Sequence, residues 1–585
     1  MTTESQRAVI AIIRKLIFAG LVLLIAWLVL LGLRGTISVD TINQMREQAT
    51  QLEEMEQKIE ISLNPWSWDW SKSIWRGIPV AEITDERLWP TFGFIGVVSG
   101  FGLLLALLYL FIGQIISHVT TKPGWPVKTR GVLRLIVISL AVSAPIYAWE
   151  NLATVYPWEW WGVPIAGGRE NPNIYTFLIA AFTASTLPAW LLVQYGHGEM
   201  AKRPGTPVLF DGASWRHLAI NMAIKILRLV GLIIVVSMFV GLSSTLSGMG
   251  RIFVDAVSMR DYPVISGIVW TIIVIVVLVK LAADLIEITY NHFRRQDGEE
   301  QMVTPAPAGG FRIPRWLLIT CLSLIAVSVI IAIAAPIIAP YGLNEMTLSA
   351  RLAPPSAEHI LGTDNLGRDV FSRLIYAIRE DIFFSLLAAA VIFLLVAGWG
   401  ILGAQVRRTN DWRGDTLEDL VMLPRDVLYA CPWLILLLLL LSLTGYPFSG
   451  TTTGFSVGIA MFIGLVLLPR AVGIMQEAYH YPPPGRKWLD VTLLSLPVVF
   501  FFAVAGGILY IAATSYLGFG VPPPTPELGG MLSGPARRYF LEAPWMALWP
   551  PAVLILLMMV WIMAGDVLLE RLGFRSKGLW SKIWE

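Results

Sequence analysis

The sequence predicts an all-α integral membrane protein in which about twelve helices cross the bilayer. Hydrophobic residues make up 56% of the 585-residue chain and charged residues only 14%, whereas soluble domains contain about 25% charged residues. The apolar residues are gathered into long runs, and a helix needs about 20 of them to span the hydrocarbon layer. Basic residues are concentrated in every second connection between the runs, which is typical of polytopic membrane proteins.

Twelve apolar runs are long enough to span the membrane as helices. The first is too long for the apolar core of a signal peptide and lacks a clear cleavage site, so we expect it to be retained as a span. The predicted spans are 8–33, 92–117, 131–149, 174–195, 218–245, 264–288, 316–340, 381–406, 416–443, 454–475, 489–517 and 545–568.

The orientation of the spans follows from Lys and Arg in short loops, which favour the cytoplasmic side. Alternate loops are basic, so both termini are predicted to be cytoplasmic, in a multi-pass protein of the plasma (inner) membrane. The basic positions are Arg7, Arg14 and Lys15; Lys122, Lys128 and Arg130; Lys202, Arg203 and Arg216; Arg294 and Arg295; Arg407, Arg408 and Arg413; Arg486 and Lys487; and Arg571, Arg575 and Lys577.

A polar, Pro- and Gly-rich segment, "QDGEEQMVTPAPAGG" (Gln296–Gly310), divides the chain into two parts with six predicted spans each. We predict a first half, 1–295, with a long external loop at 34–91, a cytoplasmic linker, 296–311, and a second half, 312–585. Two halves in the same orientation suggest parallel repeats with a pathway between them. The alternative is a lipid-exposed duplication without a pathway.

Two long segments of the second half carry a family resemblance. They are "LSARLAPPSAEHILGTDNLGRDVFSRLIYAIRE" (Leu348–Glu380) and "SYLGFGVPPPTPELGGMLSGPARRYFLEAPWMALWP" (Ser515–Pro550). They resemble external segments of one permease subunit of the dipeptide/oligopeptide/nickel ABC importers. Shorter first-half segments resemble the partner subunit: "GMGRIFVDAVSMRDYPVISGI" (Gly248–Ile268) and, more weakly, both "SIWRGIPVAEI" (Ser73–Ile83) and Ser139–Gly168.

The resemblance implies two permease subunits fused in one chain of about twelve transmembrane helices, with two parallel six-helix halves. Such a permease imports peptides or similar small solutes by alternating access. It implies separate ABC ATPase subunits on the cytoplasmic side and an extracytoplasmic solute-binding protein. Composition and motifs alone do not identify the substrate, the partner subunits or the oligomeric state.

The residues of the second-half motif also have a direct structural interpretation. Gly362 and Gly367 allow tight turns, and Asp364 with Asn365 can accept hydrogen bonds from nearby backbone donors. Arg368 and Asp369 can pair or cap the following helix. We therefore assign a structural role to Gly362, Thr363, Asp364, Gly367, Arg368 and Asp369, and no role in substrate binding.

Family members carry a cytoplasmic helix before the fifth span of each subunit, with the pattern EAA…G…LP, which couples the permease to the ATPase. In the second half the corresponding loop reads "QEAYHYPPPGRKWLDVTLLSLP". The resemblance makes Glu477, Ala478, Gly485, Arg486 and Lys487 candidates for ATPase coupling. About ten residues of the family pattern are missing, and the three prolines each cost ~3 kcal/mol inside a helix.

The first-half loop departs further from the family pattern. "YGHGEMAKRPGTPVLFDGASWRH" (Tyr195–His217) contains no EAA sequence. Only the segment that starts at Gly212 resembles the helix that follows the glycine of the family pattern. Gly212 and Arg216 are therefore the first-half coupling candidates. The basic charge of both loops is also explained by membrane topology alone.

Because both loops depart from the coupling-helix pattern of the family, three interpretations are open. The chain is a working importer with an altered, compact ATPase contact. Alternatively, it is a permease-derived subunit that has lost ATP coupling and serves as a structural or assembly component of a larger membrane complex. A third interpretation, an exporter or lipid-handling variant, has no direct support in the sequence.

Charged residues within predicted spans are expensive and are often functional. Lys280, Asp284 and Glu287 lie close to one face of the sixth span, and Asp566 occupies a position in the last span that corresponds to Asp284. We expect Lys280 and Asp284, four residues apart, to neutralise each other. A structural ion pair near the interface is the favoured interpretation.

Two external features suggest contact with lipid or with partners. Trp residues cluster in "ISLNPWSWDWSKSIW" (Ile61–Trp75) and "YPWEWWGVP" (Tyr156–Pro164), either as interfacial anchors or as a docking surface for a binding protein or another membrane subunit. Residues 44–61 form a predicted amphipathic helix, which lies either on the membrane or against a partner.

Other kinds of chemistry are not indicated. The sequence has no P-loop, no nucleophile–base set and no nucleic-acid module, so the protein is not predicted to be an enzyme, and ATP acts only through a partner subunit. The six histidines lack metal-ligand spacing, and Cys321 and Cys431 lie in apolar runs as expected for core residues. No cofactor or metal is predicted for this chain.

Overall fold

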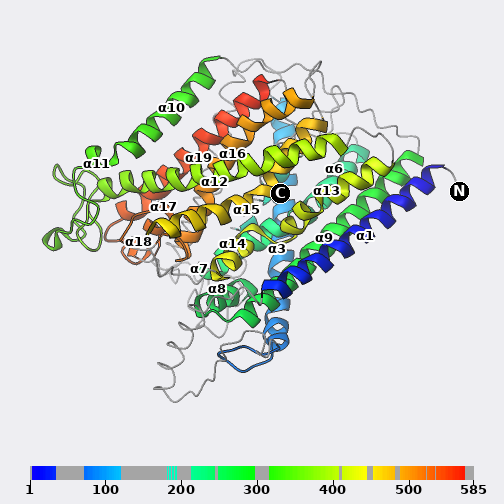
Figure 1. Ribbon diagram of the computed structural model, residues 1–585, viewed down its shortest axis with the longest axis horizontal. Helices are drawn as coiled ribbons and strands as arrows, with labels where there is room; N and C mark the ends of the chain where they lie inside the picture. Colours follow the sequence, from blue (N-terminus) through cyan, green and yellow to red (C-terminus); the bar gives the residue numbers. More distant parts are fainter. Residues whose placement is uncertain are drawn as a thin grey trace. The chain divides into compact units, whose positions relative to one another are not determined.

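The structure, a computed structural model, describes ten stretches of the chain and isolated residues between 181 and 195. The stretches are 3–33, 71–119, 212–243, 248–296, 315–406, 412–443, 452–480, 488–521, 524–533 and 535–572. Every long element in them is an α-helix (Figure 1). The predicted all-α membrane fold is thereby confirmed.

The described helices form two compact units. The first unit comprises residues 1–310 together with Tyr429–Ile435 and 577–585, and the second comprises 311–428 and 436–576. The main boundary, between Gly310 and Phe311, falls at the end of the Pro- and Gly-rich linker segment. Our assignment of these parts as permease halves remains a prediction.

The first unit contains six described helices. Within it α1 packs along α9, and α6 packs against α9 as well. A break at Leu229 bends α6 against α7 by 56°, so the predicted span 218–245 is a bent pair of helices that together pass the length and hydropathy test for one span. The helices are α1 (Thr3–Leu33), α3 (Val80–Val119), α6 (Gly212–Arg228), α7 (Val230–Ser243), α8 (Met249–Met259) and α9 (Tyr262–Gln296).

The second unit is built around α12, α15, α16 and α19, which pack against one another (Figure 1). Its elements are α10 (Arg315–Ile333), α11 (Ala335–Ile338), the 3₁₀ helix η5 (Leu348–Ala350), α12 (Val370–Val406), most of α13 (Trp412–Ala430), most of α14 (Trp433–Leu443), α15 (Thr452–His480), α16 (Trp488–Tyr516), α17 (Leu528–Met531), α18 (Pro535–Arg538) and α19 (Trp545–Arg571).

The predicted span 416–443 is also broken. Helices α13 and α14 are bent by 82° at Cys431–Pro432. Pro432 has no backbone N–H to continue the hydrogen-bond ladder of α13, and its ring crowds the preceding turn. The predicted span 416–443 therefore consists of two bent helices, which together are long and apolar enough to count as one span. Both cysteines, Cys321 and Cys431, are buried and unbridged, as predicted.

Glycines allow the central helices of the second unit to approach closely. A Cβ atom on Gly464 of α15 would lie 3.2 Å from Val391 of α12, and one on Gly507 of α16 would lie 3.0 Å from the Cα atom of Ser385. Small residues at helix contacts are typical of membrane proteins, in which van der Waals packing holds helices together. This packing fixes α12 against α16 near Ser385.

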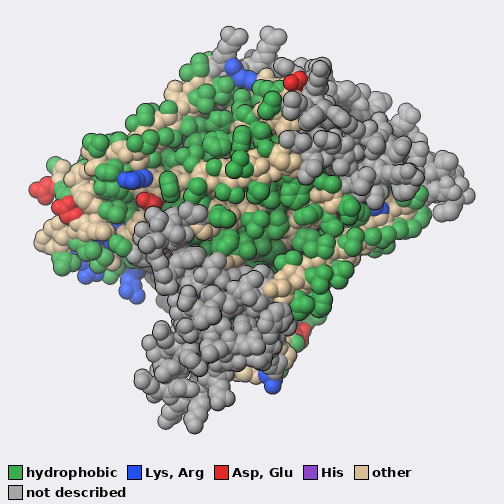
Figure 2. Space-filling view, viewed as in Figure 1, with side chains coloured by type: hydrophobic (Ala, Val, Ile, Leu, Met, Phe, Trp, Pro, Cys, Tyr) green, Lys and Arg blue, Asp and Glu red, His purple; other side chains and the backbone are tan. Residues whose placement is uncertain are grey.

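Eight described helices are long and apolar enough to cross a membrane, or ten if each bent pair counts as one span. The predicted span 131–149 and most of 174–195 lie outside the described residues. On the face shown in Figure 2, hydrophobic side chains cover most of the described surface. That surface suits contact with lipid.

Candidate functional site

The loop that precedes α12 is organised around the carboxylate of Asp364. Its Oδ1 atom accepts hydrogen bonds from the backbone N–H groups of Leu366 (2.8 Å) and Arg368 (3.0 Å). Its Oδ2 atom lies 2.7 Å from Nε of Arg368 and 3.7 Å from Nε of Arg373. The side chain of Asp364 is only 8% exposed, so this network holds the turn from within.

The two motif glycines adopt the left-handed conformation in the same loop. Gly362 has φ 75° and Gly367 has φ 73°, a region that side chains other than glycine rarely occupy. A Cβ atom on Gly367 would lie 2.0 Å from the carbonyl oxygen of Thr347. Both the backbone conformation and the close approach therefore require glycine at this position.

Asp369 caps the start of α12. Its Oδ2 atom accepts hydrogen bonds from the backbone N–H and the hydroxyl of Ser372, both at 2.7 Å. Its Oδ1 atom lies 3.0 Å from Nδ1 of His359. An acidic side chain that accepts from the first turn satisfies donors that the helix itself leaves unpaired.

The two sequence segments that carry the second-half resemblance meet in space. The indole N–H of Trp545 donates to the carbonyl oxygen of Thr363 at 3.0 Å. A guanidinium N–H of Arg351 donates to the hydroxyl of Tyr539 at 2.8 Å. Segments 348–380 and 515–550 therefore form one folded cap over the ends of α12 and α19.

Two of the first-half segments also meet. Asp261 accepts hydrogen bonds from the hydroxyl of Ser73 and the backbone N–H of Ile74, the latter at 3.2 Å. The indole N–H of Trp75 donates to the carbonyl oxygen of Met259 at 2.7 Å. Burial raises the pKa of Asp261, although these hydrogen bonds oppose the shift.

The ion pairs of α9 differ from those we expected. Asp284 lies 2.8 Å from Nζ of Lys15 on α1 and 2.7 Å from a guanidinium nitrogen of Arg228 on α6. Arg228 also pairs with Glu287. Asp284 thus joins three helices of the first unit, and its predicted pairing with Lys280 was wrong.

Lys280 makes different contacts, with Tyr429. Its ammonium group lies 3.3 Å from the carbonyl oxygen of Tyr429 and 4.3 Å from the centre of that residue's ring. Both residues belong to the first unit. A cation over a tyrosine ring is stabilised by the ring quadrupole. Asp566 lies in α19, where it is half-buried.

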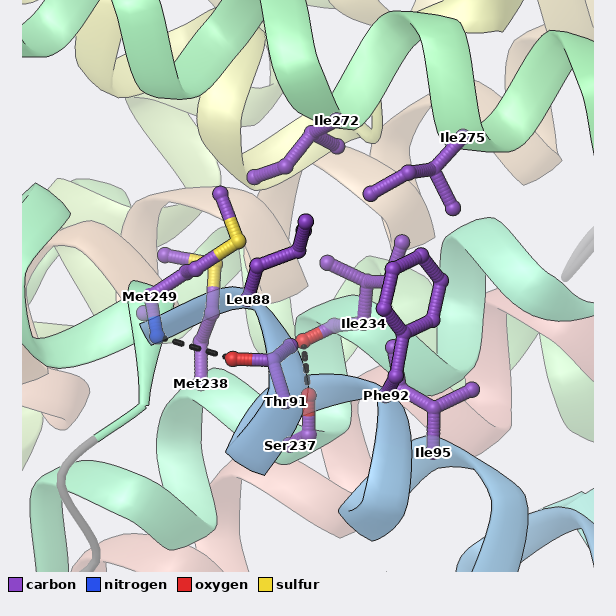
Figure 3. Close-up of a pocket in the computed structure, with 11 residues that line it drawn as sticks. Leu88, Thr91, Phe92, Ile95, Ile234, Ser237, Met238, Met249, Ile272 and Ile275 are labelled. Carbon is purple, nitrogen blue, oxygen red and sulfur yellow. Dashed lines mark hydrogen bonds between the residues drawn. The ribbon is translucent and has the colours of Figure 1, made fainter. Parts of the chain in front are cut away.

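A small pocket in the first unit lies among α3, α7, α8 and α9 (Figure 3). Its walls are mainly hydrocarbon. Two hydroxyls on it are already engaged: Thr91 Oγ1 accepts from the backbone N–H of Met249 at 3.0 Å, and Ser237 donates to the carbonyl oxygen of Ile234 at 2.7 Å. The pocket thus offers apolar packing and no convergent polar set for a solute.

Comparison with known proteins places the chain in a family. No protein-family model matches the chain. The di/tripeptide transport system permease protein DppC of Pseudomonas aeruginosa is 30% identical over 264 residues, which cover 84% of that protein and 42% of this chain. The chain belongs to the dipeptide, oligopeptide and nickel ABC permease family.

Other relatives show the same coverage. The dipeptide permease protein DppC of Haemophilus influenzae is 28% identical over 271 residues, 88% of its length and 43% of this chain. The nickel permease protein NikC of Escherichia coli K12 is 27% identical over 272 residues, 95% of its length and 45% of this chain. Each relative thus matches less than half of the chain, as expected of a fused permease.

The coupling candidates of this permease lie in three places. Glu477 and Ala478 belong to the last turn of α15, which ends at His480, and α16 begins at Trp488. Gly485, Arg486 and Lys487 lie outside the described residues. In the first unit, Gly212 is the first residue of α6, and Arg216 is exposed one turn later.

The sequence did not point to several polar residues that the fold brings together. Lys15 was noted only as a topology signal, and Arg228 was not singled out, because their pairing with Asp284 joins distant segments. Asp381 in α12 and Glu527 before α17 were also missed, and both are buried in the permease. The sequence did contain one signal for Asp381, because it is an acidic residue within a predicted span and such residues are often functional.

Proposed function

We propose that this chain supplies both permease halves of an ABC-type importer for peptides or similar small solutes. The observation that carries the proposal is the coverage of its relatives: 84% to 95% of three single permeases corresponds to less than half of this chain. The names of these relatives refer to the transport of dipeptides, di- or tripeptides and nickel.

In this proposal the solute crosses between the two halves by alternating access. The folded cap of segments 348–380 and 515–550 and the Ser73–Asp261 contact belong to the predicted external side. Their buried hydrogen bonds make each a rigid element that could move as one body with its half. Both termini are cytoplasmic, and the protein lies in the plasma (inner) membrane.

The energy for import comes from separate ATPase subunits that bind on the cytoplasmic side. A solute-binding protein delivers the substrate outside, and the Trp-rich loops, most of which lie outside the described residues, are its proposed docking surface. The contact with the ATPase is more compact than in the family pattern, because only residues 481–487 separate α15 from α16. Three of those seven residues are prolines, a residue type that is disfavoured inside a helix.

Reversing the charge of this connection tests its role. We expect the double substitution Arg486→Glu and Lys487→Glu to abolish copurification of the ATPase and solute uptake, because two cations would be replaced by anions at the contact. Copurification with the tagged permease and uptake into proteoliposomes are the measurements. The substitutions also weaken the positive-inside signal, so the topology is checked in parallel by cysteine labelling.

The matched control is Arg407→Glu with Arg408→Glu, in a different basic loop that precedes α13. This variant is expected to keep the ATPase. Unchanged association and uptake in the Arg486/Lys487 variant, with normal topology, would remove this loop from the coupling contact.

The same short connection favours a second candidate function. A permease body that has lost its coupling helices could serve as a structural or assembly subunit of a larger membrane complex. This candidate predicts a stable complex of membrane proteins that contains no ATPase, whereas the importer requires one.

A further inference from the structure

Two acidic residues of the second unit are buried next to each other. Asp381 lies in α12, where it is 0% exposed, and Glu527 directly precedes α17, where it is 2% exposed. The two side chains interact across the contact between these elements. Buried carboxylates are costly unless they are paired with cations, hydrogen-bonded or protonated.

Glu527 is held in place by the backbone of α17. Its Oε1 atom accepts from the N–H of Gly529 at 3.0 Å, and its Oε2 atom accepts from the N–H of Gly530 at 2.8 Å. A Cβ atom on Gly529 would lie 1.9 Å from the carbonyl oxygen of Ala512 in α16. This close contact requires glycine at position 529.

Asp381 has no comparable set of donors. Its carboxyl group faces Glu527 and the backbone N–H of Leu528, but that N–H does not meet hydrogen-bond geometry. Within the described part of the chain, no donor makes a hydrogen bond of ordinary geometry to either of its oxygens. The hydroxyl of Ser385, one turn further along α12, is also buried without a partner among those residues.

The surrounding charges do not neutralise the pair. The charged groups that act on Asp381 most strongly are Glu527 and Glu380, and both are acidic. The only Lys or Arg of α15 is Arg470, and its guanidinium makes a cation–π contact, 5.7 Å from the centre of the ring of Tyr510 on α16. The described side chains of α10, from Trp316 to Ile333, include no Asp, Glu, Lys or Arg.

The other neighbouring elements add little charge near the pair. Helix α17 contains only Leu528, two glycines and Met531. On α19, Asp566 and Arg571 follow Trp545 by more than twenty residues, which is roughly 30 Å along a helix. The acidic field at Asp381 therefore favours binding of a cation small enough to fit between two carboxyl groups.

We propose that Asp381 and Glu527 form a proton-binding site, in which one proton held between the two carboxyl groups joins α12 to the start of α17. The protonated carboxyl donates to the other carboxylate, which gives Asp381 a hydrogen bond and leaves one negative charge instead of two. The ligand class is a single proton, because no cluster of three or more acidic, His or Cys side chains suited to a metal ion occurs among the described residues.

The site makes the stability of the permease depend on pH. Burial raises the pKa of Glu527, although hydrogen bonds with Asp381, Gly529, Ser515 and Gly530 oppose the shift. A raised pKa in the folded state means that the folded protein holds a proton that the unfolded chain releases above about pH 4.3. The contribution of this site to stability is therefore greatest below that pH and is lost as the pH rises through the folded pKa.

Asp381→Asn mimics the protonated pair, because its amide donates to Glu527 at every pH. We expect the thermal midpoint in detergent to fall between about pH 5 and about pH 9 in the wild type, and to fall less in this variant. The matched control is Asp426→Asn, a carboxyl that is 40% exposed, which should follow the wild type. Equal pH dependence in all three proteins would contradict the proposal.

Infrared spectroscopy tests the proton directly. At about pH 8 ordinary exposed carboxyl groups are ionised, so a protonated carboxyl band in the folded protein reports a perturbed group. We expect part of this band to disappear in Asp381→Asn and in Glu527→Gln, and to remain in Asp426→Asn. If the variants fail to fold, the wild-type spectrum still decides, because absence of any such band would overturn the proposal. A band that is unchanged in both folded variants would do the same.

Discussion

Replacing Gly367 with alanine is expected to lower the free energy of unfolding by about 2–5 kcal/mol. Two penalties combine. The residue has φ 73°, and the left-handed conformation costs a residue with a Cβ atom about 1–2 kcal/mol. The new Cβ atom would also lie 2.0 Å from the carbonyl oxygen of Thr347, and such overpacking costs about 1–3 kcal/mol. The measurement is the thermal midpoint of the purified permease in detergent.

Two alanine variants separate these penalties. Gly518 has φ 90°, but a Cβ atom added to it would have no atom within 4 Å. Gly518→Ala therefore measures the cost of the backbone conformation without a steric clash. Gly473 lies in α15 with open space around it, so Gly473→Ala is expected to leave stability unchanged or slightly higher. If Gly367→Ala were no more destabilising than Gly518→Ala, the contact with Thr347 would not constrain the loop.

Removing the carboxylate of Asp364 is expected to cost about 3–5 kcal/mol. The Asp364→Ala variant would leave the guanidinium groups of Arg368 and Arg373, which are 13% and 11% exposed, without their common counter-ion. It would also leave two backbone N–H groups of the turn without their acceptor. Buried charges that lose a partner are far more costly than exposed ones, because water does not replace the lost interaction.

Asp426→Ala is the matched control for this prediction. Asp426 pairs with Arg425 at 2.7 Å but is 40% exposed, and exposed pairs contribute about 0–1 kcal/mol. The two variants should therefore differ clearly in thermal midpoint and in sensitivity to proteolysis of the loop before α12. Similar small losses in both variants would contradict the assignment of Asp364 as the centre of the cap.

The apolar runs predicted much of the fold, because the bilayer requires long helices with satisfied backbone groups. The runs at 8–33, 264–288 and 489–517 correspond to α1, α9 and α16. The bends between α6 and α7 and between α13 and α14 were not predicted. Pro432 was a visible signal for the second bend, whereas the break at Leu229, which directly follows Arg228, is marked by no proline.

The polar contacts were harder to predict than the helices. The turn at Gly362–Asp369 is local, so its residue types indicated its hydrogen bonds. The partners of Asp284 come from α1 and α6, distant in sequence, and an i,i+4 rule could not identify them. The same reason applies to Asp381 and Glu527, which are brought together only when α17 packs against α12 and α16.

The helices and the relatives identify the fold and the family of this protein, but they do not identify its contact with an ATPase. In the second half, α15 and α16 are joined by a short, proline-rich connection where family members carry a coupling helix. If the importer proposal is correct, the ATPase must contact this connection or the ends of the helices around it. The non-transporting alternative makes no such demand.

The most direct test is to purify the tagged chain from its native membranes and to measure ATP hydrolysis by the complex. The importer proposal predicts a copurified ATPase whose turnover increases when a peptide mixture and the extracytoplasmic fraction are added to the complex in lipid nanodiscs. A stable complex that contains no ATPase would contradict it and would favour the structural or assembly subunit.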